Sequence, residues 1–360
     1  MQAIILVGGK GTRLRPLTCN IPKAVVPVLN RPFLEHLLRY LGKHGIQDIV
    51  LAMGYLPTSI RDCLGDGSQL DVHLTYVVEK SPLGTAGAVK NMESLLQGAF
   101  VVLNGDILTE IDLTDMIGRH RKVMPRVTMA LTPVEDPTMY GVVETSEQGL
   151  VTCFVEKPGW GQVATNMINA GIYILNSDIL AEIPAATPYM FEQDVFPALL
   201  RKGDPILAYP SDAYWVDIGT TENYLKAHHD LLAKQHGHEI VVAGGAHIDA
   251  TARIKGPVLV GAGSWIGENA MIVGPAVLGS YCSIAHDVVI DGALLWDGVT
   301  VAEGACLHDC VIGSSVRVEA ACDVADGCVL GDHVVIQQGS RLPPDTRMWP
   351  DGCVDSDRES

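Results

Sequence analysis

A glycine-rich run near the start of the chain has the residue types that bind phosphate. It reads Leu6-Val7-Gly8-Gly9-Lys10-Gly11-Thr12-Arg13-Leu14-Arg15-Pro16, and Pro22-Lys23 follows. Glycines let backbone N–H groups approach phosphate oxygens closely. The Arg13 guanidinium can bind two phosphate oxygens at once, and Lys23 adds a point charge. Together these groups could neutralise a triphosphate whose departing pyrophosphate accumulates negative charge.

This run differs from two other phosphate-binding motifs. Leu14 stands where a dinucleotide fingerprint has its third glycine, and Gly11-Thr12-Arg13 does not supply the Gly-Lys-Ser/Thr ending of a Walker A loop. A simple structural turn would not need Arg13, Arg15 and Lys23 in a chain this acidic. We therefore interpret the run as a phosphate site of a different kind.

Two aspartates are candidates for metal binding. Asp106 follows the apolar stretch 100–103, so its carboxylate should emerge at the carboxyl end of a strand, and Asp217 follows the aromatic pair Tyr214-Trp215. An aspartate at a strand end is, taken alone, more often a helix cap or turn residue. Two carboxylates completed by phosphate oxygens and water would, however, suit octahedral Mg2+.

Glu79 is a candidate for reading the base of a nucleotide. It follows the β-prone stretch 75–78 and precedes Pro82-Leu83-Gly84-Thr85. An ionised carboxylate is an acceptor only. Guanine offers two adjacent donors, N1–H and N2–H2, whereas uracil and thymine offer one donor flanked by acceptors. A Glu79 that faces the base would favour GTP; the alternative is that Glu79 is solvated and the backbone reads the base.

The first part of the chain alternates between strand and helix patterns. Strands are expected at 3–7, 48–53, 75–78 and 100–103, and helices at 33–44 and 86–96. This alternation is typical of an α/β domain with a Rossmann-like, mixed but mostly parallel sheet. Ligands bind at the carboxyl ends of strands in such sheets, which directs attention to the loops after Val7, Val78 and Leu103.

From residue 248 the periodicity changes to six. Large apolar residues recur at every sixth position, and after a slip of register they recur again with small residues between them. The first series is Ile248, Ile254, Val260, Ile266, Ile272, Leu278, Ile284, Ile290 and Trp296, and the second is Ile312, Val318, Val324, Leu330, Ile336 and Leu342. This pattern predicts a parallel β-helix of hexapeptide repeats.

The expected organisation is an α/β catalytic domain at 1–235, a linker at 236–247, a β-helix at 248–347 and a polar, mobile tail at 348–360. The chain has 25 basic and 42 acidic residues, a net charge of −17, which disfavours binding to nucleic acid or anionic membranes. The nine cysteines have no CxxC pair, and no signal or membrane span is evident. These features favour a cytoplasmic protein with reduced thiols.

Several motifs together resemble the sugar-1-phosphate nucleotidyltransferase family. They occur in the family's order along essentially the whole chain, and the closest resemblance is to the mannose-1-phosphate guanylyltransferases, which also carry a C-terminal left-handed β-helix. Besides the glycine-rich run, the motifs are Leu83-Gly84-Thr85-Ala86-Gly87-Ala88, Leu103-Asn104-Gly105-Asp106, Phe154-Val155-Glu156-Lys157-Pro158, Asn169-Ala170-Gly171 and Trp215-Val216-Asp217-Ile218-Gly219.

The resemblance implies transfer of GMP from GTP to mannose-1-phosphate with Mg2+ as cofactor. It implies metal binding by Asp106 and Asp217, and catalytic roles for Arg13, Lys23, Asp106, Lys157 and Asp217. The implied nucleotide-binding residues are Leu6, Gly8, Gly9, Gly11, Thr12, Arg13, Glu79, Pro82, Gly84 and Thr85. The implied sugar-phosphate residues are Gly141, Glu156, Lys157, Asn169 and Gly171.

Other functions are also compatible with these motifs. The same chemistry could use dTTP or UTP with glucose-1-phosphate, or GTP with a heptose-1-phosphate. A non-catalytic subunit that senses nucleotide-sugars would have the same fold, but the implied catalytic residues are all present. The β-helix histidines admit an acyltransferase, although turn histidines are usually only solvated. We also expect a homo-oligomer assembled through the β-helix, because its flat faces and open ends are contact surfaces.

Overall fold

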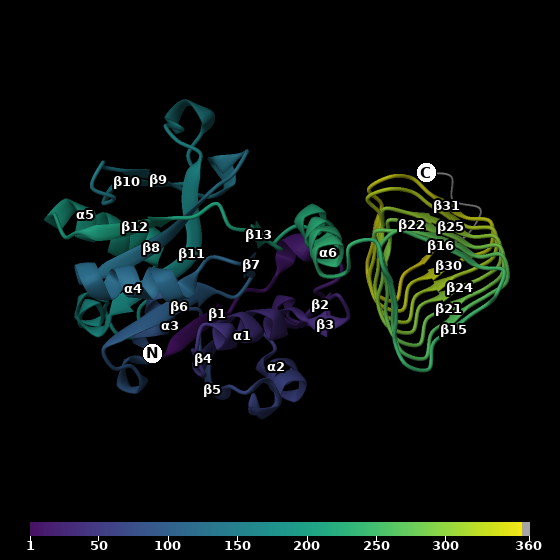
Figure 1. Cartoon of the computed structure of the whole chain (residues 1–360), viewed down its shortest axis with the longest axis horizontal. Coiled ribbons are helices and arrows are strands. Elements are labelled where there is room, and N and C mark those ends of the chain that lie inside the picture. The colour runs from purple at the N-terminus through teal and green to yellow at the C-terminus, as the bar shows by residue number, and fades with distance from the viewer. Residues whose placement is uncertain (355–360) are drawn as a thin grey trace. The chain divides into compact units, whose positions relative to one another are not determined.

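The computed structural model describes residues 1–354, and these divide into two compact units (Figure 1). The sheet unit comprises Met1–Gly9 and Leu34–Val216, and the β-helix unit comprises Lys10–Phe33 and the chain from Asp217 onward. We call Lys10–Phe33 the signature segment. The sequence pattern placed this segment in an N-terminal domain that ends at residue 235. In the structure it packs with the β-helix, because polar side chains described below bond the two together.

The sheet unit is built on one large sheet with the order β10-β9-β11-β6-β1-β4-β5; β8 pairs with β11, and β12 pairs with β8. Its strands are β1 (Ala3–Val7), β4 (Asp48–Met53), β5 (His73–Val78), β6 (Ala99–Asn104), β8 (Val127–Pro133), β9 (Gly141–Thr145), β10 (Val151–Glu156), β11 (Met167–Asn176) and β12 (Ile206–Pro210). Two short strands, β7 (Ile107–Thr109) and β13 (Trp215–Asp217), pair separately. A further short pair, β2 (Pro27–Val28) and β3 (Arg31–Pro32), lies in the signature segment.

The sheet is mixed, as the alternating pattern predicted. β1 pairs in parallel with β4 and β6, β4 pairs in parallel with β5, and β8 with β12. The long strand β11 runs antiparallel to β6, β8 and β9, and β9 runs antiparallel to β10. The carboxyl ends of β1, β5 and β6 therefore lie on one edge, which is where the loops of interest begin.

Six α-helices accompany the strands in residues 1–354: α1 (Phe33–Lys43), α2 (Pro57–Leu64), α3 (Gly84–Lys90), α4 (Leu113–Val123), α5 (Phe196–Lys202) and α6 (Thr221–His236). The apolar residues of α1 recur with helical spacing, and Leu34, Leu37, Leu38 and Leu41 are fully buried. The hydroxyl of Thr220 caps α6 by accepting the backbone N–H of Asn223. Local sequence thus accounts for where α1 and α6 form.

An aromatic cluster anchors the core of the sheet unit. Tyr173, Phe191 and Phe196 are fully buried, with ring centroids 5.0–5.7 Å apart. Aromatic side chains bury large apolar areas and pack with defined geometry. The cluster fixes the backbone of residues 191–196, and with it the polar residue Glu192 that follows Phe191.

The β-helix consists of three parallel sheets, visible as stacked turns in Figure 1. The first holds β14 (Ile240–Val242), β17 (Val258–Val260), β20 (Ala276–Leu278), β23 (Leu294–Leu295), β26 (Val311–Ile312), β29 (Val329–Leu330) and β32 (Arg347–Met348). The second holds β15 (His247–Ile248), β18 (Trp265–Ile266), β21 (Ser283–Ile284), β24 (Thr300–Val301), β27 (Arg317–Val318), β30 (Val335–Ile336) and β33 (Cys353–Val354). The third holds β16 (Arg253–Lys255), β19 (Met271–Val273), β22 (Val289–Asp291), β25 (Cys306–His308), β28 (Asp323–Val324) and β31 (Arg341–Leu342).

The apolar ladder follows the predicted six-residue repeat up to Ile290 and then shifts by one residue. Leu295 occupies the next interior position, and Trp296, which the repeat placed inside, is not part of the interior cluster. The strand pairing explains the shift. Ala276 pairs with Val258, which defines the length of the preceding coil. Leu294 pairs with Val277 before it and with Val311 after it, and each of the two coils defined by these pairs is one residue shorter. Trp296 is consequently directed out of the coil.

The β-helix ladders extend past the predicted bounds of 248–347. Ile240 pairs with Val258 in the expected linker, and Cys353 pairs with Val335 in the expected tail. The rest of that tail, residues 355–360, lies outside the described residues. Across the described helices, none combines the length and apolar character needed to cross a bilayer.

Candidate active site

Two cations of the signature segment converge on one carboxylate. An Arg13 nitrogen lies 3.3 Å from Asp217 Oδ2, and Lys23 Nζ lies 3.4 Å from Asp217 Oδ1. The side chains of Lys23 and Asp217 are only 10% and 12% exposed, whereas that of Arg13 is 52% exposed. The Gly219 N–H also donates to Asp217 Oδ1, at 2.7 Å. The structure thus brings together three of the five predicted catalytic residues.

Glycines make this close approach possible. A Cβ atom at Gly219 would lie 2.4 Å from an Arg13 guanidinium nitrogen and 2.7 Å from Asp217 Oδ1. Gly11 has a φ of +63°, and a Cβ there would lie 3.0 Å from the Cβ of Lys23. The Gly11 carbonyl accepts the hydroxyl of Thr18 at 2.7 Å, which holds the loop closed. Any side chain at either glycine would push the cations away from Asp217.

Glu79 lies beside the first glycine of the loop, within the sheet unit. A Cβ at Gly8 would lie 3.9 Å from Glu79 Oε2, and the Leu83 N–H points to the same oxygen at 3.4 Å. Burial raises the pKa of Glu79, and the Leu83 N–H partly opposes this rise. The half-buried carboxylate therefore has unused acceptor positions at the carboxyl end of β5.

The segment after Glu79 is bonded to residues 189–191. The N–H groups of Ala86 and Gly87 both donate to the Tyr189 carbonyl at 3.0 Å. Gly84 has a φ of +71°, and a Cβ there would meet the Tyr189 carbonyl oxygen at 2.6 Å. The first amides of α3 are thus used internally, while Pro82 stays exposed beside Glu79.

The end of β10 carries two more of the predicted residues. Glu156 pairs with Gly141 across the β9–β10 ladder, and a Cβ at Gly141 would lie 2.8 Å from Glu156 Oε2. Burial and the charge of Glu192 raise the pKa of Glu156, and Lys157 opposes the rise. Lys157 has a φ of +47°, which is rare for a residue with a side chain, and its exposed side chain leaves the strand there.

A bulge in β11 places Asn169 and Gly171. The pairing of β11 with β8 is irregular between Asn169 and Tyr173. Asn169 Oδ1 accepts the Gly171 N–H at 2.9 Å, and Asn169 Nδ2 donates to the Tyr173 hydroxyl at 2.6 Å. Gly171 has a φ of +71°, and a Cβ there would lie 2.7 Å from the side-chain amide of Asn104. Of the predicted sugar-pocket residues, Asn169 and Gly171 are therefore held in one connected network.

Glu192 joins this network and was missed by the sequence analysis. It accepts the Thr85 hydroxyl at 2.8 Å and the Tyr173 hydroxyl at 3.3 Å. Its charge, together with burial, raises the pKa of Glu156. Glu192 thus links the predicted nucleotide residue Thr85 to the predicted sugar residue Asn169 through Tyr173. The local signal in the sequence was an acidic residue directly after the large apolar residue Phe191.

Asp106 emerges from a tight crossing at the end of β6. The Gly105 N–H donates to the Leu6 carbonyl at 2.9 Å, and a Cβ at Gly105 would lie 2.5 Å from the same oxygen. Asp106 is half-buried after this glycine. It belongs to the sheet unit, whereas Asp217 belongs to the β-helix unit.

The donor chemistry of these aspartates fits Mg2+. An ionised carboxylate has about four acceptor positions, and the bonds from Arg13, Lys23 and Gly219 use three positions on Asp217. Among residues 1–354, no group of three or more His, Cys, Asp or Glu side chains is placed to hold a metal ion. A Mg2+ ion bound to either carboxylate would therefore need further oxygen ligands from phosphates and water.

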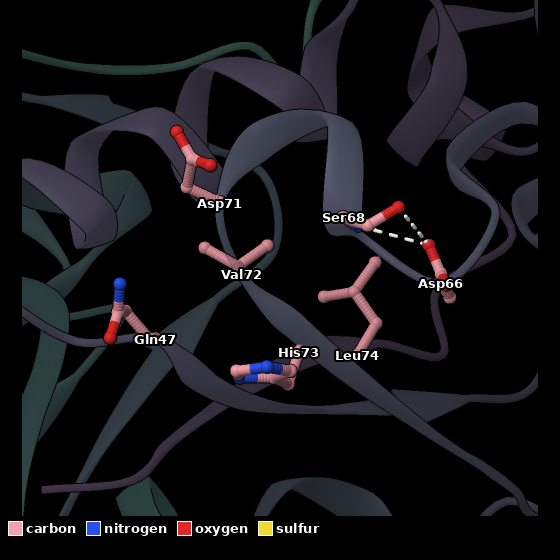
Figure 2. A pocket seen from close by; sticks show the side chains of 7 residues that line it. All are labelled: Gln47, Asp66, Ser68, Asp71, Val72, His73 and Leu74. Atoms are coloured by element: carbon pink, nitrogen blue, oxygen red, sulfur yellow. Dashed lines mark hydrogen bonds between the residues drawn. The ribbon is translucent and has the colours of Figure 1, made fainter.

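A separate pocket lies at the other end of β5. Figure 2 shows its lining, and Asp66 in it accepts two bonds from Ser68. The pocket is lined by Gln47, Asp66, Ser68, Asp71, Val72, His73 and Leu74. His73 begins β5, whereas Glu79 follows its last residue, so the pocket is at the amino-terminal edge of this strand. It contains none of the predicted site residues.

Comparisons with known proteins agree with both parts of the fold. A family model described as "Nucleotidyl transferase" matches residues 2–234. A model described as "EIF2B subunit epsilon LbH domain" matches residues 238–342, which agrees with a left-handed β-helix made of the three parallel sheets.

Relatives extend the similarity across most of the chain. "Mannose-1-phosphate guanylyltransferase" of Mycobacterium tuberculosis is 36% identical over 314 residues, covering 84% of this chain and 82% of the relative. "UTP--glucose-1-phosphate uridylyltransferase" of Synechocystis is 32% identical over 355 residues, covering 89% and 92%. The structure of HddC from Yersinia pseudotuberculosis complexed with GMP-PN is 32% identical with a TM-score of 0.56, covering 64% of this chain and 99% of HddC. With a family model that matches more than half of its residues, the chain belongs to the nucleotidyl transferase family.

Proposed function

We propose that this protein transfers GMP from GTP to mannose-1-phosphate, releasing pyrophosphate and a nucleotide-activated sugar. The observation that carries the proposal is the convergence of Arg13 and Lys23 on Asp217. Such a cluster suits a polyphosphate with a divalent cation, because the basic groups neutralise phosphate charge and the carboxylate is a metal ligand. Family membership and the names of the relatives support the reaction class and the substrates.

The reaction is an in-line displacement at the α-phosphorus of the nucleotide. A phosphate oxygen of the sugar-1-phosphate forms the new P–O bond, and the bond to the bridging oxygen breaks as pyrophosphate leaves. This nucleophile is anionic near neutral pH, so no side chain needs to act as a base. The residues of the chain act by positioning and by charge stabilisation. Arg13 and Lys23 neutralise the departing pyrophosphate, and Lys157 holds the attacking phosphate in line.

Asp106 and Asp217 would hold the Mg2+ ion, which when bound neutralises phosphate charge and orients the triphosphate. The glycine-rich backbone from Gly8 to Gly11 approaches the phosphate oxygens, with Leu6 and Thr12 on either side. The Gly219 N–H keeps the Asp217 carboxylate in place beside Arg13 and Lys23. Asp106→Asn should raise the Mg2+ concentration needed for half-maximal rate.

Glu79 is the residue proposed to read the base. Its partly buried carboxylate lies next to Gly8 and can accept both donors of the guanine edge. Pro82, Gly84 and Thr85 complete this side. The sugar hydroxyls are proposed to bond with Glu156, Asn169 and Glu192, while the glycines Gly141 and Gly171 leave room for the ring.

A second candidate uses the same chemistry with UTP and glucose-1-phosphate. The 32% identity to a uridylyltransferase over 89% of the chain favours it specifically. Uracil has a single donor flanked by acceptors, so the ionised Glu79 would repel one of the uracil carbonyl groups. We therefore rank UTP with glucose-1-phosphate second to GTP with mannose-1-phosphate. The pairs dTTP with glucose-1-phosphate and GTP with a heptose-1-phosphate rank third.

The test is pyrophosphate release from a panel of four NTPs, each with mannose-1-phosphate or glucose-1-phosphate, with Mg2+ and then with EDTA. Metal-dependent release with GTP and mannose-1-phosphate is the expected result. Release with UTP or dTTP would keep the mechanism and overturn the role of Glu79. No release with any pair would favour a non-catalytic sensor of nucleotide-sugars.

Further proposals concern assembly and location. Trp265 and Tyr281 of the β-helix are 50% and 74% exposed, which favours a homo-oligomer through this unit. A monomeric mass by light scattering at micromolar concentration would overturn it. Cys282, Cys310, Cys322 and Cys328 are buried as thiols, which favours a reducing cytoplasm.

A further inference from the structure

The β-helix unit contains the segment that supplies Arg13 and Lys23. Hydrogen bonds join the coils and α6 to this segment at four places, and all of these contacts lie within the one unit. Two of the contacts are near its end, at residues 27–30, and two are near its start, at residues 15–20. The signature segment is therefore attached to the β-helix on both sides of Lys23.

The first attachment is mostly buried. Trp296, turned outward by the shortened coils, donates its indole N–H to the Tyr224 hydroxyl at 3.1 Å. The Tyr224 hydroxyl donates in turn to the Pro27 carbonyl, and Tyr224 is fully buried. The Asn30 amide donates to the Leu278 carbonyl of β20 at 2.7 Å. These bonds fix the carboxyl-terminal part of the segment against the coil and α6.

The second attachment lies beside the catalytic cations. The Asn20 amide donates to Asp332 Oδ2 at 3.2 Å, and the other oxygen of Asp332 accepts the Ser314 N–H at 2.9 Å. Asp332 is buried, so its carboxylate is held rigidly by the coil. Arg347 donates to the Arg15 carbonyl at 2.8 Å, two residues from Arg13.

We propose that Asp332 and Arg347 are positioning residues for the proposed nucleotidyl transfer, because they hold the turn at residues 15–20 so that Arg13 and Lys23 face Asp217. The cations lie 3.3–3.4 Å from the carboxylate, which is longer than a tight charge-assisted bond. A displacement of the turn at residues 15–20 would move Arg13 and Lys23 relative to Asp217. The β-helix then contributes to binding of the triphosphate as well as to assembly. The predicted changes in KM rest on the proposed function, whereas the attachment of the segment to the β-helix does not.

The variants exploit the geometry of the Asn20–Asp332 bond. Asp332→Ala removes it, and Asn20→Asp places two carboxylates together. The double variant Asn20→Asp with Asp332→Asn restores one donor and one acceptor with reversed polarity, and the new amide oxygen can still accept the Ser314 N–H. Arg347→Ala removes the second bond, whereas Arg347→Lys keeps a donor. Asp297→Ala is the matched control, because Asp297 accepts the Ser280 N–H at 2.6 Å in an equivalent turn.

Two readouts are needed on the full-length protein. The first is amide hydrogen exchange of residues 11–26 without ligands, which does not depend on activity. The second is KM for GTP and for pyrophosphate in the reverse reaction, compared with KM for the sugar-1-phosphate. Asp332→Ala, Asn20→Asp and Arg347→Ala should speed exchange and raise KM for GTP and pyrophosphate by roughly tenfold to a hundredfold, with KM for the sugar-1-phosphate near that of the wild type. The double variant and Arg347→Lys should return both readouts toward wild type.

The proposal is overturned if Asp332→Ala and Asp297→Ala behave alike, that is, if each changes only the melting temperature. It is also overturned if the double variant restores nothing. If the wild type turns over no substrate pair, the proposed function fails while exchange still tests the attachment. Unchanged exchange in Asp332→Ala and Arg347→Ala would then overturn the positioning role separately.

Discussion

Asp217 Oδ1 lies 3.4 Å from the Nζ atom of Lys23, a residue 194 positions earlier in the chain. Both side chains are almost removed from solvent, so neither charge can be fully hydrated. Two charges in such surroundings interact strongly. Removing one leaves the other buried without its partner, which destabilises the folded protein. The pair therefore joins the stability of the fold to the chemistry of the site.

Lys23→Met should reduce kcat/KM by at least about 100-fold, which corresponds to about 2.7 kcal/mol of transition-state stabilisation. It removes a cation from the leaving group. It should also lower the free energy of unfolding by about 1–3 kcal/mol, because Asp217 loses a partner. Pyrophosphate release and urea unfolding measure the two effects. Arg39→Met is the control, since Arg39 forms only an exposed pair with Glu35. Turnover near that of wild type would remove Lys23 from the mechanism.

Gly219→Ala should weaken catalysis although only one methyl group is added. The new Cβ would lie 2.4 Å from the Arg13 guanidinium, so Arg13 must leave Asp217. We expect kcat/KM to fall by about 10- to 100-fold, measured by pyrophosphate release. Gly118→Ala in α4 is the matched control, since its Cβ meets nothing within 4 Å. That change should stabilise the protein by about 0.5–1 kcal/mol and leave activity unchanged. Equal activities of the two variants would contradict the close approach.

Glu79→Gln should weaken discrimination between GTP and UTP. Burial raises the pKa of Glu79, so lowering the pH protonates this carboxyl earlier than an ordinary one. Because only the ionised form accepts both guanine donors, KM for GTP should rise as the pH falls through that pKa, and should be constant above it. The variant should have a raised KM for GTP at neutral pH and lose this acid dependence. KM profiles for GTP between pH 4.5 and 8 would show this, and identical profiles would argue for reading of the base by the backbone.

Glu192→Gln should affect the sugar substrate more than the nucleotide. The change removes the negative charge that raises the pKa of Glu156 and weakens the acceptor of the Tyr173 hydroxyl. We expect KM for the sugar-1-phosphate to rise by about 10-fold, or about 1.4 kcal/mol, with KM for GTP changed much less. Glu147→Gln on the exposed turn after β9 is the control. A larger effect on GTP than on the sugar would assign Glu192 to the nucleotide side through Thr85.

The sequence was sufficient to predict the two architectures. Alternation of strand and helix patterns located β1, β4, β5 and β6, and a six-residue period located the β-helix. Local motifs carried the glycines at 11, 141, 171 and 219, whose backbones lie where a side chain would collide. These features depend on residues that are close together in the sequence. A local sequence pattern is therefore enough to predict them.

Other features depend on partners far away in the chain. Nothing near Lys23 indicates that Asp217 is its partner, and nothing near Asn20 indicates Asp332. Glu192 was missed because its contacts are made by Thr85 and Tyr173, which are distant in sequence. The one-residue shortening before Leu295 was misread at Trp296, because a six-residue count cannot show in which turn a residue is missing.

The attachment of Asn20 to Asp332 also has a consequence for synthesis of the chain. The two residues are 312 positions apart, so the ribosome makes the signature segment long before its docking surface exists. At roughly 5–20 residues per second, the delay is about 16–60 s. During that interval Arg13 and Lys23 lie on a segment whose contacts with the β-helix have not yet formed. Translation must pass residue 332 before the phosphate-binding cations can adopt their final arrangement, so nascent chains arrested earlier should lack a competent nucleotide site.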